Sequence, residues 1–103
     1  MADANTHPIK LVTIVCEAHA RDAVTGLLRD VGAHGWTLFQ VEGDGAHGTR
    51  PADIPEFANI QIEVLLQPEA ASALLERLEN DFFPLYAMVA FESDVRVLRR
   101  GKF

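Results

Sequence analysis

The sequence predicts an α+β fold in which one antiparallel sheet carries two helices on one face. Segments rich in β-branched residues alternate with two segments of helical periodicity, in the order β-α-β-loop-β-α-β. The run Asn59–Leu66 (NIQIEVLL) alternates apolar and polar residues, as a strand does when one of its faces is buried. A length of 103 residues and a hydrophobic fraction of 49% suit a single globular domain over residues 1–103.

The first part of the chain is predicted to contain a tail, a strand and a helix. Residues 1–8 are small and polar and end at a proline, which indicates a mobile tail. Residues 9–16 (IKLVTIVC) form the first expected strand. A helix follows, and Gly32 suits its C-terminal end. Its expected apolar stripe consists of Ala23, Val24, Leu27, Leu28 and Val31.

A glycine-rich loop is predicted to separate the second and third strands. Residues 36–42 form the second expected strand, and residues 43–57 then contain three glycines and two prolines. Prolines deny such a stretch regular structure, so we expect a loop of about fifteen residues. Asn59–Leu66 is the third strand, with Ile60, Ile62, Val64 and Leu66 on its buried face.

The last part of the chain is predicted to contain a helix and two strands. Pro68 opens the helix and Pro84 ends it. Its expected apolar stripe consists of Ala71, Leu74, Leu75, Leu78 and Phe82. Residues 86–91 form a fourth strand and residues 95–98 a short terminal one, followed by a basic tail at residues 99–103.

This element order is the split βαβ, or ferredoxin-like, arrangement (βαββαβ). Both helices then pack on one face of the sheet. The other face carries Gln61 and Glu63 beside apolar residues, so it meets either water or another subunit.

Composition excludes several classes of protein. A net charge of −6 opposes binding to nucleic acid and to anionic membrane surfaces. No apolar run is long enough to span a membrane, and the N-terminus lacks the pattern of a signal peptide. The lone cysteine, Cys16, fits a buried structural thiol in a reducing compartment, so we expect a cytoplasmic protein.

No catalytic or metal site is predicted. His7, His19, His34 and His47 are scattered, and none has a partner at the spacing of metal ligands. The sequence contains no Gly-x-Ser-x-Gly motif. We therefore expect no enzymatic activity and no catalytic cofactor.

Two features could bind an anion. The loop glycines Gly43, Gly45 and Gly48 could let backbone N–H groups approach phosphate oxygens, although the motif alone favours an ordinary hairpin turn. The basic segment RVLRRGK, residues 96–102, suits an anion site and a solubilising tail about equally.

Taken together, these elements resemble the PII signal-transduction superfamily. The resemblance runs from Lys10 to about Arg99. The pattern GWTLFQVEGDG, residues 35–45, is similar to the entry of PII proteins into their T-loop, and the strand at residues 59–64 is similar to their return strand. Glu63 stands where the family usually has a glutamate facing the trimer interior.

A closer resemblance is to the PII-like branch associated with bicarbonate transporters and carboxysomes. It rests on Ala58-Asn59-Ile60, on the segment FFPLYA at residues 82–87, and on Arg50 within the loop. The segment at residues 84–87 lacks the Gly-Lys that grips ATP in classical members, Asn59 replaces their T-loop lysine, and the loop has no tyrosine to be uridylylated. Fewer cations suit fewer phosphates, so AMP, ADP or cyclic AMP is expected over ATP.

The resemblance implies a homotrimer that binds adenine nucleotides in clefts between subunits. Residues 43–57 would be the signalling loop, which nucleotide binding would order. The implied nucleotide-binding residues are Thr37, Gly43, Asp44, Gly45, Val64, Ala87 and Arg96. Those implied for phosphate or bicarbonate are Arg50, Asn59 and Arg99. A bicarbonate transporter or carboxysome-related protein is the implied partner, and the implied role is regulation of carbon uptake or fixation.

Two other functions remain open. A small cofactor-free oxygenase or isomerase on the same fold would use Trp36, His34 and Asn59 to line a pocket in a dimer. A CutA-like trimer would have no nucleotide site.

Overall fold

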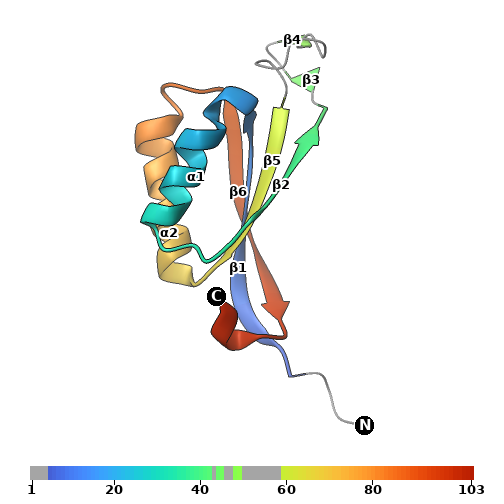
Figure 1. The fold of residues 1–103 in the computed structure, drawn as a ribbon, viewed down its shortest axis with the longest axis vertical. Helices are drawn as coiled ribbons and strands as arrows, with labels where there is room; N and C mark the ends of the chain where they lie inside the picture. Colours follow the sequence, from blue (N-terminus) through green and yellow to red (C-terminus); the bar gives the residue numbers. More distant parts are fainter. Residues whose placement is uncertain (1–4, 43, 46–47, 50–58) are drawn as a thin grey trace.

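A four-stranded antiparallel sheet with two helices on one face forms the body of the protein (Figure 1). The computed structural model describes residues 5–42, 44–45, 48–49 and 59–103. The sheet contains β1 (His7–Glu17), β2 (Thr37–Val41), β5 (Asn59–Leu66) and β6 (Met88–Val97), and the helices are α1 (Arg21–Asp30) and α2 (Pro68–Arg77). Across the sheet the order is β2-β5-β1-β6. The expected ferredoxin-like fold is therefore confirmed.

The small strands β3 (Asp44–Gly45) and β4 (Gly48–Thr49) pair with each other within the segment expected to be the signalling loop. The rest of that segment, including Gly43 and Arg50, lies outside the described residues, as does the N-terminal tail up to residue 4.

The core lies between the helices and the two central strands. Alternate residues of β1 and β5 are buried beneath the helices, and every second position of β5 follows the predicted pattern. The buried set is Val12, Ile14 and Cys16 from β1, Ile60, Ile62, Val64 and Leu66 from β5, Ala20 just before α1, Val24, Leu27 and Leu28 from α1, and Ala71, Leu74 and Leu78 near α2. Burial of these apolar side chains is the main force that holds the helices on the sheet.

Helix α1 ends at a glycine, as predicted. Gly32 has φ of +86°, a left-handed conformation that L residues with a side chain rarely adopt. The N–H of Gly32 donates to the carbonyl of Arg29 at 3.0 Å, and that of Ala33 donates to Leu28 at 2.9 Å. These two bonds form a Schellman motif, which satisfies carbonyls that would otherwise lack partners at the helix end.

One residue of the α1 stripe is wrongly predicted. Ala23 is exposed, whereas Thr25 is buried and its Oγ1 donates to the carbonyl of Asp22 at 3.3 Å. The helix presents the side that includes Thr25 and Leu28 to the sheet, which places Ala23 at the solvent edge of the stripe.

Two strands differ from the prediction. Strand β1 begins at His7, so part of the expected tail belongs to the sheet. Pro8 pairs with β6, while pairing with β5 starts at Lys10. At Pro8, therefore, β1 has a neighbouring strand on one side only, which suits a proline because it has no N–H to donate. Strand β6 is continuous from Met88 to Val97 instead of two separate strands.

The polar residues in the middle of β6, residues 92–94, are held in the strand by pairing with β1. Lys10 of β1 lies 2.6 Å from the Oδ1 of Asp94 and 3.8 Å from the Oε1 of Glu92. Unbroken pairing with β1, from His7 to Cys16, keeps the polar residues in the strand. At the end of α2, a π-helical turn (Leu78–Phe82) continues the chain toward Pro84.

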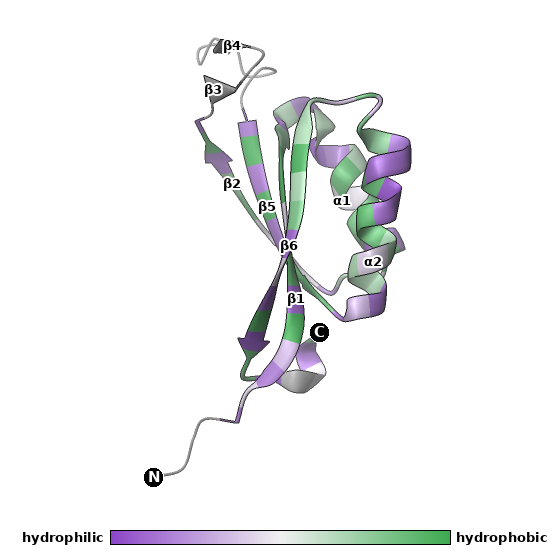
Figure 2. Ribbon diagram, turned by 180° about the vertical axis from the view of Figure 1, so that it is seen from behind, coloured by the Kyte–Doolittle hydropathy of each residue, from purple (hydrophilic) through white to green (hydrophobic). Residues whose placement is uncertain are grey.

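The face of the sheet away from the helices is partly apolar. Figure 2 shows apolar and polar segments alternating along β5 and β6. Phe39, Gln61, Val15 and Val89 lie opposite one another in successive strands and form one row across this face. Phe39, Val89 and Phe91 are 38%, 60% and 50% exposed, so large apolar side chains meet solvent in the single subunit. No helix among the described residues is long and apolar enough to cross a membrane.

Candidate functional site: a hollow beside Thr37

A hollow of about 600 Å³ lies at the end of the sheet where β2 begins. We call it the Thr37 hollow. Its walls come from all four strands of the main sheet, from the loop at residues 34–36 that enters β2, and from the C-terminal residues Lys102 and Phe103.

Strand alternation directs the side chains of β5 into this hollow. Glu63 and Leu65 point away from the helices, opposite to their buried neighbours Val64 and Leu66. Thr37 lies directly opposite Glu63 in the register of β2 and β5. The hollow therefore combines an apolar surface with a hydroxyl and a carboxylate, the latter accepting a hydrogen bond from Gln61 Nε2 at 3.3 Å.

Trp36 contributes an aromatic wall. Its ring is half-buried and packs against the core, and the guanidinium carbon of Arg29 lies 5.2 Å from the ring centroid. This cation–π contact from α1 restrains the ring at the edge of the hollow.

Arg96 supplies a cation on the opposite side of the hollow. Its Nε donates to Thr6 Oγ1 at 2.7 Å and its Nη2 donates to the Thr6 carbonyl at 3.2 Å. An arginine has five N–H donors, so these two bonds leave others for an anion. The structure thus brings two predicted nucleotide-binding residues, Thr37 and Arg96, to one hollow.

Other predicted residues lie at the far end of the sheet. Asn59 begins β5 and pairs with Glu17 of β1, whereas Arg96 pairs with Pro8. Nine positions of β1 separate these pairs, which is about 30 Å at roughly 3.3 Å per residue. Ala87 is exposed just before β6, near the Asn59 end, and Arg99 is exposed just beyond β6, at the Arg96 end. One subunit cannot bring Asn59 and Arg96 to the same small ligand.

Val64 does not direct its side chain toward a ligand. That side chain is 1% exposed and belongs to the core beneath the helices. Its neighbours Glu63 and Leu65 line the hollow instead. The alternation along β5, which is visible in the sequence, could have identified these two residues as facing away from the helices. Gly43 and Arg50 lie outside the described residues, and Asp44 and Gly45 form β3.

Among the described residues, the cysteine and histidine side chains do not form a catalytic or metal-binding site. Burial raises the pKa of the Cys16 thiol to about 11, with a smaller contribution from the charge of Glu17, so this thiol stays protonated at neutral pH. His19 Nδ1 lies 3.3 Å from Glu17 Oε2, and its ring packs beside that of Tyr86 at a tilt of 48°, with ring centroids 5.6 Å apart. Among the described residues, no group of three or more His, Cys, Asp or Glu side chains could hold a metal ion.

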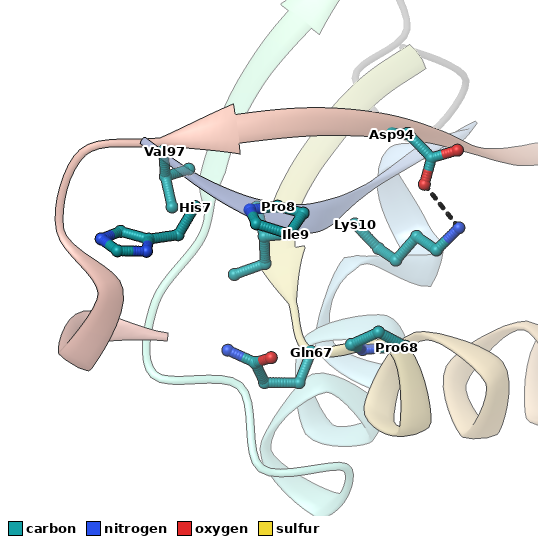
Figure 3. A pocket seen from close by; sticks show the side chains of 8 residues that line it. All are labelled: His7, Pro8, Ile9, Lys10, Gln67, Pro68, Asp94 and Val97. Carbon is teal, nitrogen blue, oxygen red and sulfur yellow. Dashed lines mark hydrogen bonds and ion pairs between the residues drawn. The ribbon is translucent and has the colours of Figure 1, made fainter. Parts of the chain in front are cut away.

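A second hollow, of about 500 Å³, lies between the ends of β1 and β6 and the start of α2 (Figure 3). Its ammonium group, Lys10, points to Asp94 and forms an ion pair with it. The hydrogen bond to Asp94 raises the pKa of Lys10, which keeps the pair charged. Because that ammonium is already neutralised, this hollow is less suited to an anion than the Thr37 hollow.

Comparison with known proteins identifies the family. The model of the nitrogen regulatory protein P-II family matches residues 9–102, which is nearly the whole chain. The chain belongs to the PII family. No match is found among curated proteins.

Solved structures of PII-like proteins have the same fold. A PII-like signalling protein from Thermus thermophilus is 36% identical, with a TM-score of 0.84, over 95% of this chain and 97% of that one. CPII from Thiomonas intermedia, bound to ADP and bicarbonate, is 29% identical, with a TM-score of 0.88, over 98% and 99% of the two chains. CPII bound to ADP, AMP and bicarbonate is 28% identical, with a TM-score of 0.89, over 98% of each chain.

Proposed function

We propose that this protein is a PII-like regulator that binds ADP or AMP, together with bicarbonate, in clefts between subunits. The observation that carries the proposal is the similarity to CPII over 98% of the chain, since CPII structures contain ADP, AMP and bicarbonate. The Thr37 hollow supports it, because an aromatic and aliphatic surface beside a hydroxyl, a carboxylate and an arginine suits a nucleotide.

The separation of the predicted residues favours a site shared between subunits. Asn59 and Arg96 are about 30 Å apart along the sheet, by the rise of roughly 3.3 Å per residue. They can contact one ligand only if they come from different copies of the chain. In this proposal, one copy supplies Asn59, Ala87 and the loop residues, and another supplies Arg96 and Arg99.

A trimer would also cover the apolar face of the sheet. Phe39, Val89 and Phe91 are large apolar residues that the helices leave uncovered. Removal of this surface from water favours association. The polar residues Gln61 and Glu63 lie among them and would find partners within the interface.

We expect the number of phosphates on the preferred nucleotide to follow the number of cations in the site. Pro84, Leu85 and Ala87 are exposed at the turn before β6, where this chain offers no lysine or arginine. A site with few cations favours AMP, ADP or cyclic AMP over ATP. In the cell, we propose that residues 43–57 report occupancy to a bicarbonate transporter or a carboxysome-related protein.

Calorimetric titration with AMP, ADP, ATP and cyclic AMP, each with and without bicarbonate, tests the binding proposal. We expect ADP or AMP to bind more tightly than ATP. Trp36 is the sole tryptophan in the sequence and lines the hollow, so its fluorescence gives a second readout. Thr37→Val and Arg96→Ala should weaken binding, whereas Arg77→Ala on α2 should not. Failure of all four nucleotides to bind would refute the proposal.

A further inference from the structure

The C-terminal residues 100–103, which we call the C-terminal turn, lie at the Thr37 hollow and are hydrogen-bonded to a residue of the second hollow. Lys102 and Phe103 line the Thr37 hollow, and Val97, just before them, lines both hollows. Gln67 lines the hollow of Figure 3 and hydrogen-bonds to Phe103. The segment expected to be a basic tail is thus folded as a 3-10 turn, and it forms part of the wall of the candidate site.

Two side chains hold this turn through its backbone. His34 Nδ1 lies 2.8 Å from the carbonyl oxygen of Lys102, and Gln67 Nε2 donates to the backbone oxygen of Phe103 at 3.2 Å. The carbonyl can only accept, so Nδ1 of His34 carries the hydrogen. His34 is 68 residues away from Lys102 in the sequence, so this bond is a tertiary contact.

Among the described side chains of the turn, apolar packing comes from Phe103. Leu98, which precedes it, is 67% exposed, and Arg99, Gly101 and Lys102 are exposed as well. Phe103 is half-buried. The hydrogen bonds from His34 and Gln67 add directional contacts that fix the backbone of the turn beside this ring.

We infer that His34 is a positioning residue of the Thr37 hollow, which docks the C-terminal turn so that Lys102 and Phe103 form one wall of the site. His34 lies in the loop that enters β2 at Thr37, so one residue ties the turn to the segment that carries the predicted nucleotide-binding threonine. The effect of this docking on ligand affinity rests on the proposed nucleotide binding. By thermodynamic reciprocity, a ligand in the hollow should also stabilise the docked turn.

The docking is tested first without ligand. Heteronuclear NOE values of the 15N-labelled amides of residues 100–103 should match those of the sheet in the wild type and fall in His34→Ala and in Gln67→Ala. His34→Asn should restore them, because the asparagine Nδ2–H stands where the histidine Nδ1–H stood. Arg77→Ala, remote on α2, should leave them unchanged. Unchanged values in both His34→Ala and Gln67→Ala would overturn the inference, whether or not any nucleotide binds.

The effect on the site is tested with ADP. Loss of the His34 bond should weaken ADP binding by about threefold to tenfold, the range that corresponds to one neutral hydrogen bond. Affinity should recover in His34→Asn. A turn that is released in His34→Ala while ADP binding stays at the wild-type value would overturn the positioning role. If wild-type protein does not bind ADP at all, the proposed function fails, and the NOE values still decide whether His34 docks the turn.

Discussion

The positions of individual arginines determine where this protein could bind an anion. Arg96 reaches the Thr37 hollow with donors to spare, and Arg99 is exposed nearby. Neither can meet Asn59 within one subunit. In the proposed site, cations reach the Asn59 end from Arg96 and Arg99 of another copy, and the loop at residues 43–57 can add Arg50 of the same copy.

Arg50→Ala should weaken ADP or AMP binding by about tenfold to a hundredfold, because a charge-assisted hydrogen bond to phosphate contributes roughly that factor. The melting temperature without ligand should change little. If bicarbonate and nucleotide are coupled, each must alter the affinity of the other by the same factor, and the substitution should reduce this coupling. Titration calorimetry checks both effects. Unchanged nucleotide affinity and unchanged coupling in Arg50→Ala would remove Arg50 from the site.

Cys16 should make stability fall at alkaline pH. Burial raises its pKa in the folded protein from the ordinary value of 9.0 to about 11. Between these two pKa values the folded state keeps the thiol proton, whereas the unfolded chain releases it. The contribution of Cys16 to the free energy of unfolding is therefore at its maximum below pH 9 and decreases as the pH rises toward 11.

Urea denaturation of the wild type and Cys16→Ala at several pH values between about 8 and about 11 measures this effect. Other alkaline groups contribute similarly to both proteins, so the wild type should lose more stability with rising pH than the variant. Equal slopes would show that the thiol is not shielded in the folded state.

In and after helix α1, the same glycine-to-alanine substitution should change stability in opposite directions at two positions. Gly26 lies inside the helix with open space where a Cβ would stand, whereas Gly32 ends it with a left-handed φ of +86°. Gly26→Ala should therefore stabilise the protein by about 0.5–1 kcal/mol, since alanine is the better helix former. Gly32→Ala should destabilise it by about 1 kcal/mol or more.

Chemical denaturation of the two variants against the wild type measures these changes. The two alanines serve as controls for each other, because the added methyl group is the same. A shift of equal sign at both positions would contradict the assignment of the Schellman motif at Gly32.

For the whole molecule, the uncovered sheet face should determine assembly. Phe91 is 50% exposed and lies opposite Thr13 in the register of β1 and β6, within this face. Phe91→Asp should dissociate a trimer, because the buried carboxylate would lack a partner, and it should also weaken ADP binding if the site is shared between subunits.

Sedimentation velocity should give the wild type about three times the chain mass of 11.3 kDa and give Phe91→Asp a smaller species. Ala73→Asp, on the exposed side of α2, is a matched control and should remain trimeric. A folded wild-type monomer at micromolar concentration would refute the trimer and the shared site together.

Features that depend on local chemistry could be predicted from the amino-acid sequence. Alternation over Asn59–Leu66 specified a strand with one buried face, because successive side chains of a strand point to opposite sides. Pro68 and Gly32 specified helix boundaries through their restricted or permissive φ. The spacing of residues around the glycine loop pointed to the PII family, which the match over residues 9–102 confirms.

Features that depend on pairing between distant segments became visible only in the folded chain. Continuous pairing with β1 made one strand of β6 and drew His7 and Pro8 into the sheet, although their own sequence is polar or lacks a donor. The orientation of α1 left Ala23 exposed. The meeting of Thr37, Arg96 and the C-terminal turn in one hollow follows from strand register and from the bond between His34 and Lys102, which local patterns cannot encode because the partners are 68 residues apart.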